Sequence, residues 1–210
     1  LVYEFDGGPH KAPGTTQLNG TTLGASSAVK GIFDYWRQGT GGTPTQKVIA
    51  HVDTRIVQDT GAGVMGDIVT GLVEGAVPQY STFNDLLILA SDALLDVPRS
   101  WDQTTFQNLA GSPPRFSFSV PHKNRQWAAG DFANPSRLSY SAHNAPDSWT
   151  GAGSGSMEID PNDGDMITGI ISHKDSLFVF KGPYTGSIHR ILGSTPEDFS
   201  RVIFTRGLGA

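Results

Sequence analysis

The chain contains no cysteine among its 210 residues, and only 17% of its residues are charged. Without cysteine, neither a disulfide framework nor a thiolate metal site can form. The longest uninterrupted apolar run, Leu86 to Ala90, is far too short to cross a bilayer, so we expect no membrane span. The absence of disulfides fits folding in a reducing cytoplasm.

The formal net charge is −5. An acidic balance argues against binding of nucleic acid over the whole surface, because the phosphate backbone attracts cations. Four basic residues gather near the C-terminus: Lys181, Arg190, Arg201 and Arg206. These residues do not exclude a local basic patch, but we favour the interpretation that they are scattered, solvated charges on strand faces.

Signatures of catalysis and of metal binding are also missing. The six histidines form no H-E-x-x-H motif or comparable ligand pair, and no serine completes a G-x-S-x-G elbow. A sugar-cleaving enzyme would need two carboxylates spaced across a cleft. Asp131, Asp147 and Asp163 are available, but nothing in the sequence brings two of them together. We therefore predict that the chain is not an enzyme and has no catalytic, cofactor-binding or metal-binding residues.

Two local motifs favour turns over ligand sites. Residues 61–66 match G-x-G-x-x-G, which binds a dinucleotide only when a helix follows it. The next residues, 67–71, are poor helix formers, so we predict a hairpin turn. Residues 160–165 are rich in acidic and amide side chains, but Gly164 stands where a calcium loop needs a ligand. We favour an Asx-rich turn there, with a weak ion site left open.

Glycine and proline are plentiful, with 26 and 13 residues, and indicate many tight turns. No window sustains the 3.6-residue apolar period of a helix. Pairs of short apolar runs return about every 40 residues, at 47–57, 86–106, 124–141 and 177–191. A period of about 40–45 residues with several strands per unit is typical of β-propeller blades. Such a sheet cannot bury its apolar faces alone and must pack against its neighbours.

We therefore predict an all-β, β-propeller-like domain at 29–210. It should consist of about four repeated antiparallel sheet units, at 31–76, 77–111, 112–160 and 161–210. We expect this propeller to be incomplete, or part of a larger one with blades beyond Ala210. Residues 1–28, rich in Gly, Thr and Pro, should form an extended arm that lies on a neighbour or on the domain itself.

Aromatic residues refine this prediction. The alternation of Phe116, Phe118 and Val120 predicts one half-buried strand face. The irregular, Gly-rich stretch 143–155 predicts an exposed loop that could reach an adjacent subunit. The four tryptophans of the chain are Trp36, Trp101, Trp127 and Trp149. Their spacing of about one per repeat predicts that they pack between blades, and the alternative is a platform on which sugars stack.

Several segments together carry a family resemblance, among them N-R-Q-W-A-A-G at 124–130 and N-P-S-R-L-S-Y-S at 134–141. The others, which occur in the order that the family shows, are 101–106, 112–114, 145–149, 163–169 and 177–181. From about Lys30 to Ala210, the chain resembles the propeller-type tail proteins of tailed bacteriophages. That class includes tail nozzle and packaged-DNA stabilisation proteins.

The resemblance implies a non-enzymatic structural component of the virion, without cofactors. Such a protein forms a symmetric ring in the tail, as nozzle, hub or connector, around the DNA passage, and is assembled in the host cytoplasm. Its expected partners are copies of itself and other tail or portal-proximal proteins, with DNA passing transiently. The alternative is a carbohydrate- or receptor-binding β-propeller of a viral tail, in which Trp36, Trp127 and Trp149 meet the ligand.

Overall fold

All regular structure in the described residues is β. The computed structural model describes residues 2–3, 9–10, 28–39, 41–90 and 96–207. In them, sixteen strands form four antiparallel sheets of four strands each. The predicted all-β fold of about four repeated antiparallel sheet units is confirmed, in a propeller-like arrangement. None of the described residues belongs to a helix that could span a membrane.

The four sheets are numbered along the chain, and within each the strands pair in chain order. Sheet 1 contains β3 (Val29–Arg37), β4 (Thr45–Val52), β5 (Arg55–Asp59) and β6 (Met65–Val69). Sheet 2 contains β7 (Gln79–Phe83), β8 (Leu86–Ala90), β9 (Arg99–Trp101) and β10 (Phe106–Asn108). Sheet 3 contains β11 (Phe118–His122), β12 (Arg125–Ala129), β13 (Arg137–Tyr140) and β14 (Gly155–Glu158). Sheet 4 contains β15 (Met166–His173), β16 (Ser176–Gly182), β17 (Ser187–Leu192) and β18 (Ser200–Arg206).

The expected N-terminal arm lies mostly outside the described residues. Its described parts are β1 (Val2–Tyr3) and β2 (Pro9–His10), which pair antiparallel with each other in a separate two-stranded sheet.

Tight turns close the first hairpin of sheets 2 and 3. Asn84 and Asp85 join β7 to β8 with φ angles of 48° and 60°, and Lys123 and Asn124 join β11 to β12 with 47° and 57°. Two successive residues with positive φ match the twist of antiparallel strands, and Asn and Asp tolerate this conformation better than most residues. The short turns fix the register that places the second strand of each sheet in the core.

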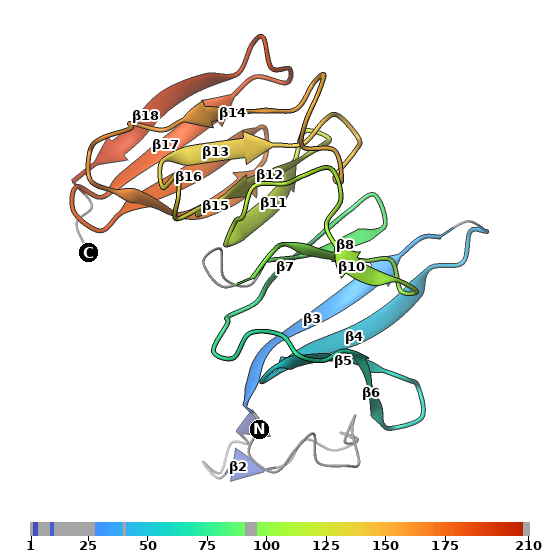
Figure 1. Cartoon of the computed structure of the whole chain (residues 1–210). Coiled ribbons are helices and arrows are strands. Elements are labelled where there is room, and N and C mark those ends of the chain that lie inside the picture. The colour runs from blue at the N-terminus through green and yellow to red at the C-terminus, as the bar shows by residue number, and fades with distance from the viewer. Residues whose placement is uncertain (1, 4–8, 11–27, 40, 91–95, 208–210) are drawn as a thin grey trace.

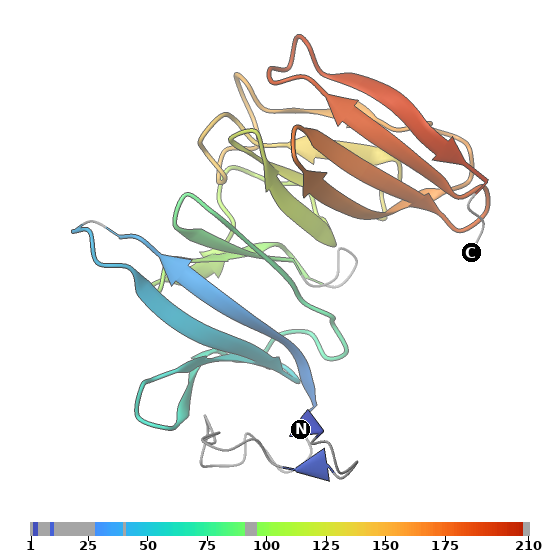
Figure 2. The same cartoon turned by 180° about the vertical axis from the view of Figure 1, so that it is seen from behind.

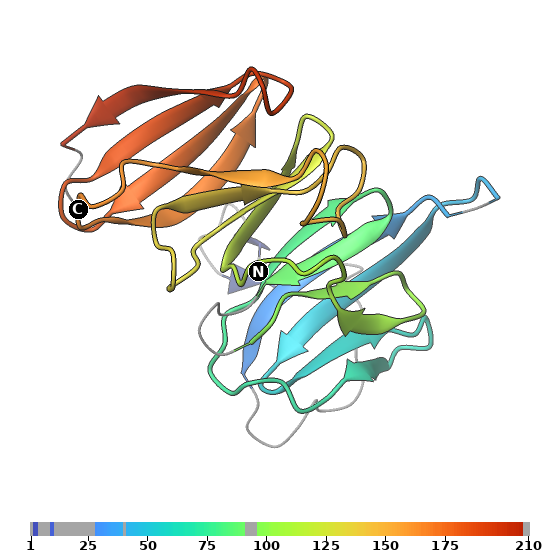
Figure 3. The ribbon, with the colours of Figure 1, turned by 45° about the horizontal axis from the view of Figure 1, so that its top comes forward.

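The sheets follow one another along an arc, each stacked beside the next (Figure 1). Neighbouring sheets meet through their first strands: β3 contacts β7, β7 contacts β11, and β11 contacts β15. The view from behind in Figure 2 and the tilted view in Figure 3 both place sheets 1 and 4 at opposite ends of the arc. The first and last sheets therefore do not cover each other.

An apolar layer fills each of the three spaces between sheets. Between sheets 1 and 2, Tyr35 and Ile49 pack with Leu87, Leu89 and Trp101. Between sheets 2 and 3, Ile88 and Ala90 pack in a cluster that also holds Ala128, Phe116 and Trp149. Between sheets 3 and 4 lies the largest cluster, with Trp127, Leu138, Ile167, Leu177 and Val179 among its members.

The two middle sheets bury both of their faces. Along β8, Leu87 and Leu89 point to sheet 1, whereas Ile88 and Ala90 point to sheet 3. Successive side chains of a strand point to opposite faces, so burial of both faces requires an uninterrupted apolar run. This explains why the longest such run of the chain, 86–90, lies in this strand.

The predicted packing of tryptophans between blades is confirmed for three of the four. Trp101, Trp149 and Trp127 each belong to a different layer, whereas Trp36 is 53% exposed. Trp36 lies on the face of sheet 1 that no other sheet covers, which is why the expectation is wrong for it. The expected shared face of Phe116, Phe118 and Val120 is also wrong: Phe116 precedes β11 and packs toward sheet 2, and the other two pack toward sheet 4.

The loop at 143–155 is only partly exposed, against expectation. Pro146 and Trp149 are buried, and the Trp149 backbone amide donates to the carbonyl of Gly111, 3.3 Å away, in the connection between sheets 2 and 3. Gly111 has a φ of +78°, and a Cβ there would overlap the Asp147 carbonyl. Only a residue without a side chain permits this close approach. The first half of the loop is thus part of the core.

Truncating Trp149 tests this packing. We expect Trp149→Ala to lower the free energy of unfolding by about 3–5 kcal/mol, as large-to-small changes in cores do. The control is Phe132→Ala, which removes an aromatic side chain from an exposed position between β12 and β13 and should change stability by no more than about 0.5 kcal/mol. Urea unfolding followed by circular dichroism gives both values. Equal losses would contradict the assignment of Trp149 to the core.

Candidate functional site

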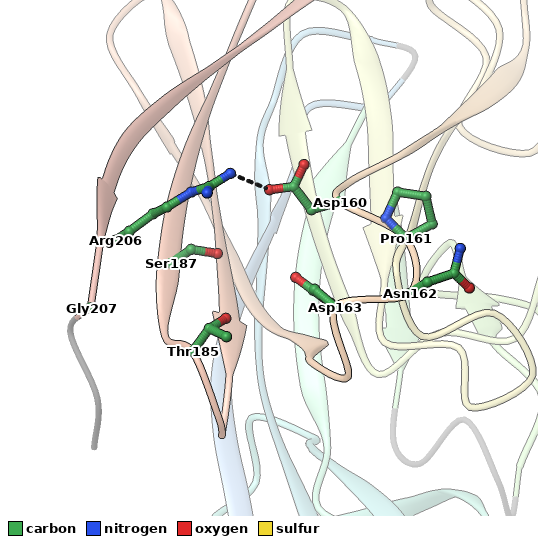
Figure 4. A pocket seen from close by; sticks show the side chains of 8 residues that line it. All are labelled: Asp160, Pro161, Asn162, Asp163, Thr185, Ser187, Arg206 and Gly207. Carbon is green, nitrogen blue, oxygen red and sulfur yellow. Dashed lines mark hydrogen bonds and ion pairs between the residues drawn. The ribbon is translucent and has the colours of Figure 1, made fainter.

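A pocket of about 630 Å³ lies where the connection between sheets 3 and 4 meets the outer strands of sheet 4. The connection at 159–165 forms one wall, and the turn between β16 and β17 and the end of β18 form the other (Figure 4). Its lining residues are Asp160, Pro161, Asn162, Asp163, Thr185, Ser187, Arg206 and Gly207. Asp160, Asp163 and Arg206 place ionisable side chains in the lining of this pocket, and further charged residues lie beside them.

Asp165 fixes one wall of the pocket to the other. Its carboxylate accepts hydrogen bonds from the backbone amides of Tyr184, Thr185 and Gly186 at 2.6, 2.9 and 3.2 Å, and from the Thr185 hydroxyl. Burial opposes ionisation of this carboxyl, but these hydrogen bonds outweigh it and hold its pKa below the usual value. Asp165 therefore shapes the β16–β17 turn and has no free oxygen.

Lys181 carries a fully buried ammonium group. It lies on β16 with the same side-chain direction as Leu177 and Val179, toward sheet 3. Its Nζ lies 2.8 Å from both carboxylate oxygens of Asp163 and 2.7 Å from the carbonyl of Ile159. It also reaches the Asp160 carbonyl and the Ser136 hydroxyl. All the hydrogen-bonding capacity of this ammonium is thus used to join sheet 4 to sheet 3.

Asp160 pairs with two arginines of β18. Its carboxylate accepts from Arg201 and from Arg206, the latter at 3.2 Å, as Figure 4 shows for Arg206. The hydrogen bond from Arg201, together with the positive charges around it, holds the pKa of Asp160 below its usual value although burial opposes this. The three basic residues Lys181, Arg201 and Arg206 therefore engage two acidic side chains of the connection.

A histidine and a serine lie beside these ion pairs but do not form a nucleophilic triad. His189 Nε2 lies 2.9 Å from the Ser187 hydroxyl and 3.8 Å from the Asp160 carboxylate. A triad needs the carboxylate on the other ring nitrogen, where it orients the imidazole. Here Nδ1 is buried without a hydrogen-bond partner, and burial lowers the pKa of the ring. The arrangement cannot hold His189 as an oriented general base for Ser187.

The arrangement therefore works as an ionic clamp between sheets 3 and 4, and we call Asp160, Asp163, Asp165, Lys181, Arg201 and Arg206 the clamp. The Asx-rich turn expected at 160–165 is the interpretation that these contacts support, because each of its three aspartates has protein partners. Among the described residues, no three His, Asp or Glu side chains are placed to hold a metal ion.

The other predicted motifs lie apart from the pocket. Residues 61–66 form the turn and strand start between β5 and β6, with the Thr60 amide and hydroxyl both donating to the Val64 carbonyl, so the predicted hairpin turn is confirmed. Three carboxylates were candidates for a sugar-cleaving enzyme. Asp131 accepts hydrogen bonds from Ala133 and Asn134 within the turn that it begins. Asp147 lies in the 143–155 loop, and Asp163 pairs with Lys181. The structure brings none of them together as a catalytic pair.

The histidines are distributed over the sheets as well. His51, His122 and His189 are buried, one each in sheets 1, 3 and 4, and burial lowers the pKa of all three. His143 and His173 are exposed, and His10 lies in β2. His122 Nδ1 lies 2.8 Å from the Ser172 hydroxyl, a further polar contact between sheets 3 and 4.

The expected solvation of the C-terminal basic residues is wrong for Lys181, whose side chain is fully buried. Arg190 lies on the opposite face of sheet 4 from Lys181, so the four basic residues do not form one patch. Sequence reasoning also missed Ser187 and His189. One signal was available: Lys181 continues the i, i+2 series of Leu177 and Val179, which places it on the buried face.

No protein-family model matches the chain, and no curated protein matches its sequence.

Breaking the clamp from either side should have unequal effects. Asp163→Ala leaves the ammonium of Lys181 buried without its counter-ion, and we expect it to lower the free energy of unfolding by about 3–5 kcal/mol. Lys181→Met should cost less, because Asp163 is 22% exposed and can turn toward water. Urea unfolding of both variants measures the difference. A larger loss for Lys181→Met would contradict the assignment of the buried charge.

Proposed function

We propose that the chain is a non-enzymatic structural component of a bacteriophage virion. In this proposal it forms a symmetric ring in the tail, as nozzle, hub or connector, around the DNA passage. Its partners are further copies of itself and other tail or portal-proximal proteins, and assembly takes place in the host cytoplasm.

The observation that carries a structural role is the arc of four sheets, in which the outer face of each end sheet has no other sheet against it. Sheets packed face to face form rigid blocks, and such blocks assemble into rings through their ends. The pocket beside the clamp supports the same role, because its ionisable groups are engaged with one another rather than oriented toward a substrate. The placement in a phage tail rests on the resemblance of the segments between Trp101 and Lys181.

The net charge of −5 also suits this role. A channel wall that attracted phosphates would hold the DNA, whereas an acidic protein lets it pass without lasting contact.

The structure gives the carbohydrate-binding alternative little support. A sugar-stacking platform needs exposed aromatic faces on one surface. The carbohydrate-binding alternative assigns the ligand contact to Trp36, Trp127 and Trp149. Trp127 and Trp149 are buried in two different layers, and only Trp36 of these three is exposed.

The test is the morphology of phage particles produced without this chain. We expect DNA-filled heads with incomplete tails and loss of infectivity, both restored when the chain is supplied from a plasmid. Electron microscopy with an antibody against the chain should label tails of complete particles. Complete, infectious tails in its absence, without labelling in its presence, would overturn the proposal.

A further inference from the structure

The exposed apolar side chains of the strands are confined to the two end sheets. Among the residues of the strands β3 to β18 themselves, every exposed large apolar side chain lies in a strand of sheet 1 or sheet 4, and the other exposed ones lie in connections between strands. We call the face that a sheet turns toward the next sheet its forward face, and the opposite one its backward face. Both faces of sheets 2 and 3 are covered by the neighbouring sheets. The forward face of sheet 4 and the backward face of sheet 1 have no sheet against them.

The forward face of sheet 4 is mainly apolar. Leu177 and Val179 point toward sheet 3, so Phe178 and Phe180 point away from it. Across the strands, Phe178 pairs with Ile171 and with Arg190, and Arg190 pairs with Val202. Ile171 is 52% exposed and Val202 49%.

Two further observations extend this apolar face. Phe204, 63% exposed, contacts Phe178 edge to face, with ring centroids 5.5 Å apart. A pocket of about 440 Å³ opens beside Phe180 and Ile188, which are cross-strand partners. The face thus offers both protruding side chains and a recess, as a surface for packing does.

On the backward face of sheet 1, the side chains of β4 and β5 are already buried in an apolar cluster of Ala50, Val52, Val57 and Met65, so the open part of this face lies along β3. Phe33 stacks on Tyr80 of sheet 2, so Ile32, Asp34 and Trp36 point the other way. Ile32 is 68% exposed and Trp36 53%. First strands form the contacts between all neighbouring sheets, so these side chains lie where a preceding sheet would pack.

The charges on the two faces are opposite. The four strands of sheet 4 contain no acidic residue, and Arg190 lies centrally on its forward face. In the described part of the chain, Arg190 has no carboxylate partner, and its Nε donates to the Ser176 hydroxyl at 2.7 Å. On the backward face of sheet 1, Asp34 lies between Ile32 and Trp36, and Arg55 of β5 is paired there with Asp67 of β6, which leaves Asp34 as the acidic group beside the exposed apolar side chains. Opposite charges of this kind favour one pairing of surfaces over others.

We infer that the forward face of sheet 4 docks on the backward face of sheet 1 of a second copy of this chain. The contact repeats the order of the three internal interfaces, in which a forward face always meets a backward face. A second copy placed by a two-fold axis makes the contact twice, so two arcs of four sheets close a ring of eight. Rings of about four to eight sheets are those that propellers adopt. The inference rests on the proposed ring and specifies the surfaces that form it.

Two single substitutions on exposed residues test the contact. Ile171→Asp alters only the forward face of sheet 4, and Ile32→Asp alters only the backward face of sheet 1. The matched control is Val77→Asp, which places the same charge on an exposed apolar residue in the connection between sheets 1 and 2. All three sites are exposed, so circular dichroism should show an unchanged fold, and sedimentation equilibrium gives the mass and the dissociation constant.

We expect the wild type and the Val77→Asp variant to dimerise. Each end-face variant alone should raise the dissociation constant by at least about tenfold, as loss of a central apolar contact does. An equimolar mixture of the two end-face variants should regain a dimer, because one copy still offers an intact sheet 4 and the other an intact sheet 1. Only a forward-to-backward contact predicts this rescue.

Three outcomes would overturn the inference: a monomeric wild type at all concentrations, equal weakening by Val77→Asp, or absence of rescue in the mixture. None of them affects the phage-particle test, which depends on incorporation into tails through any surface. Conversely, rescue in solution together with complete tails in the absence of the chain would retain the interface and reject the virion role.

Discussion

The fold depends on the face-to-face packing of consecutive sheets. A four-stranded meander with apolar residues on both faces cannot exclude water alone, and each sheet here is completed only by its neighbours. Each of the three spaces is filled by a separate apolar layer that contains one buried tryptophan. Because every layer takes side chains from two sheets, the stability of a sheet is inseparable from that of the next one. The outer faces of the first and last sheets have no neighbouring sheet, although β4 and β5 are buried on that side of the first sheet.

The clamp supplements this packing between sheets 3 and 4. Lys181 joins the inner face of sheet 4 to the carbonyl of Ile159 and the carboxylate of Asp163, and Arg201 and Arg206 join β18 to Asp160. A buried ion pair contributes little net stability compared with apolar packing, but it disfavours other registers, because a shift would leave a charge unpaired. The clamp therefore serves the specific alignment of sheets 3 and 4 more than the strength of their association.

Much of the architecture could be predicted from the sequence, because spacing and turn residues are local properties. The recurrence of paired apolar runs predicted the four sheets. The poor helix formers after the glycine motif at 61–66 predicted the hairpin turn before β6. Burial depends instead on which faces meet. The alternation at Phe116, Phe118 and Val120 predicted one buried face, but a middle sheet has two, and the chain before β11 turns Phe116 to the other side.

The site was harder to predict, because its members are far apart in the sequence. Asp160 and Arg206 are brought together only when β18 pairs with β17 and the 159–165 connection folds over the end of the sheet. Trp36 illustrates the same limit, since its spacing resembles that of the buried tryptophans and only its position on an end sheet exposes it. The placement in a phage tail stays a prediction, because it rests on a resemblance of short segments and on no property of the folded chain.

Hydrogen exchange of the backbone amides of the whole chain, read strand by strand, tests most directly whether consecutive sheets cover each other. β8 and β12 are hydrogen-bonded on both sides and belong to sheets that are covered on both faces, so they should exchange slowest. The outer strands β6 and β18 of the end sheets should exchange much faster. Exchange of β8 and β12 as fast as that of β6 and β18 would show that the sheets do not cover one another and would contradict this account.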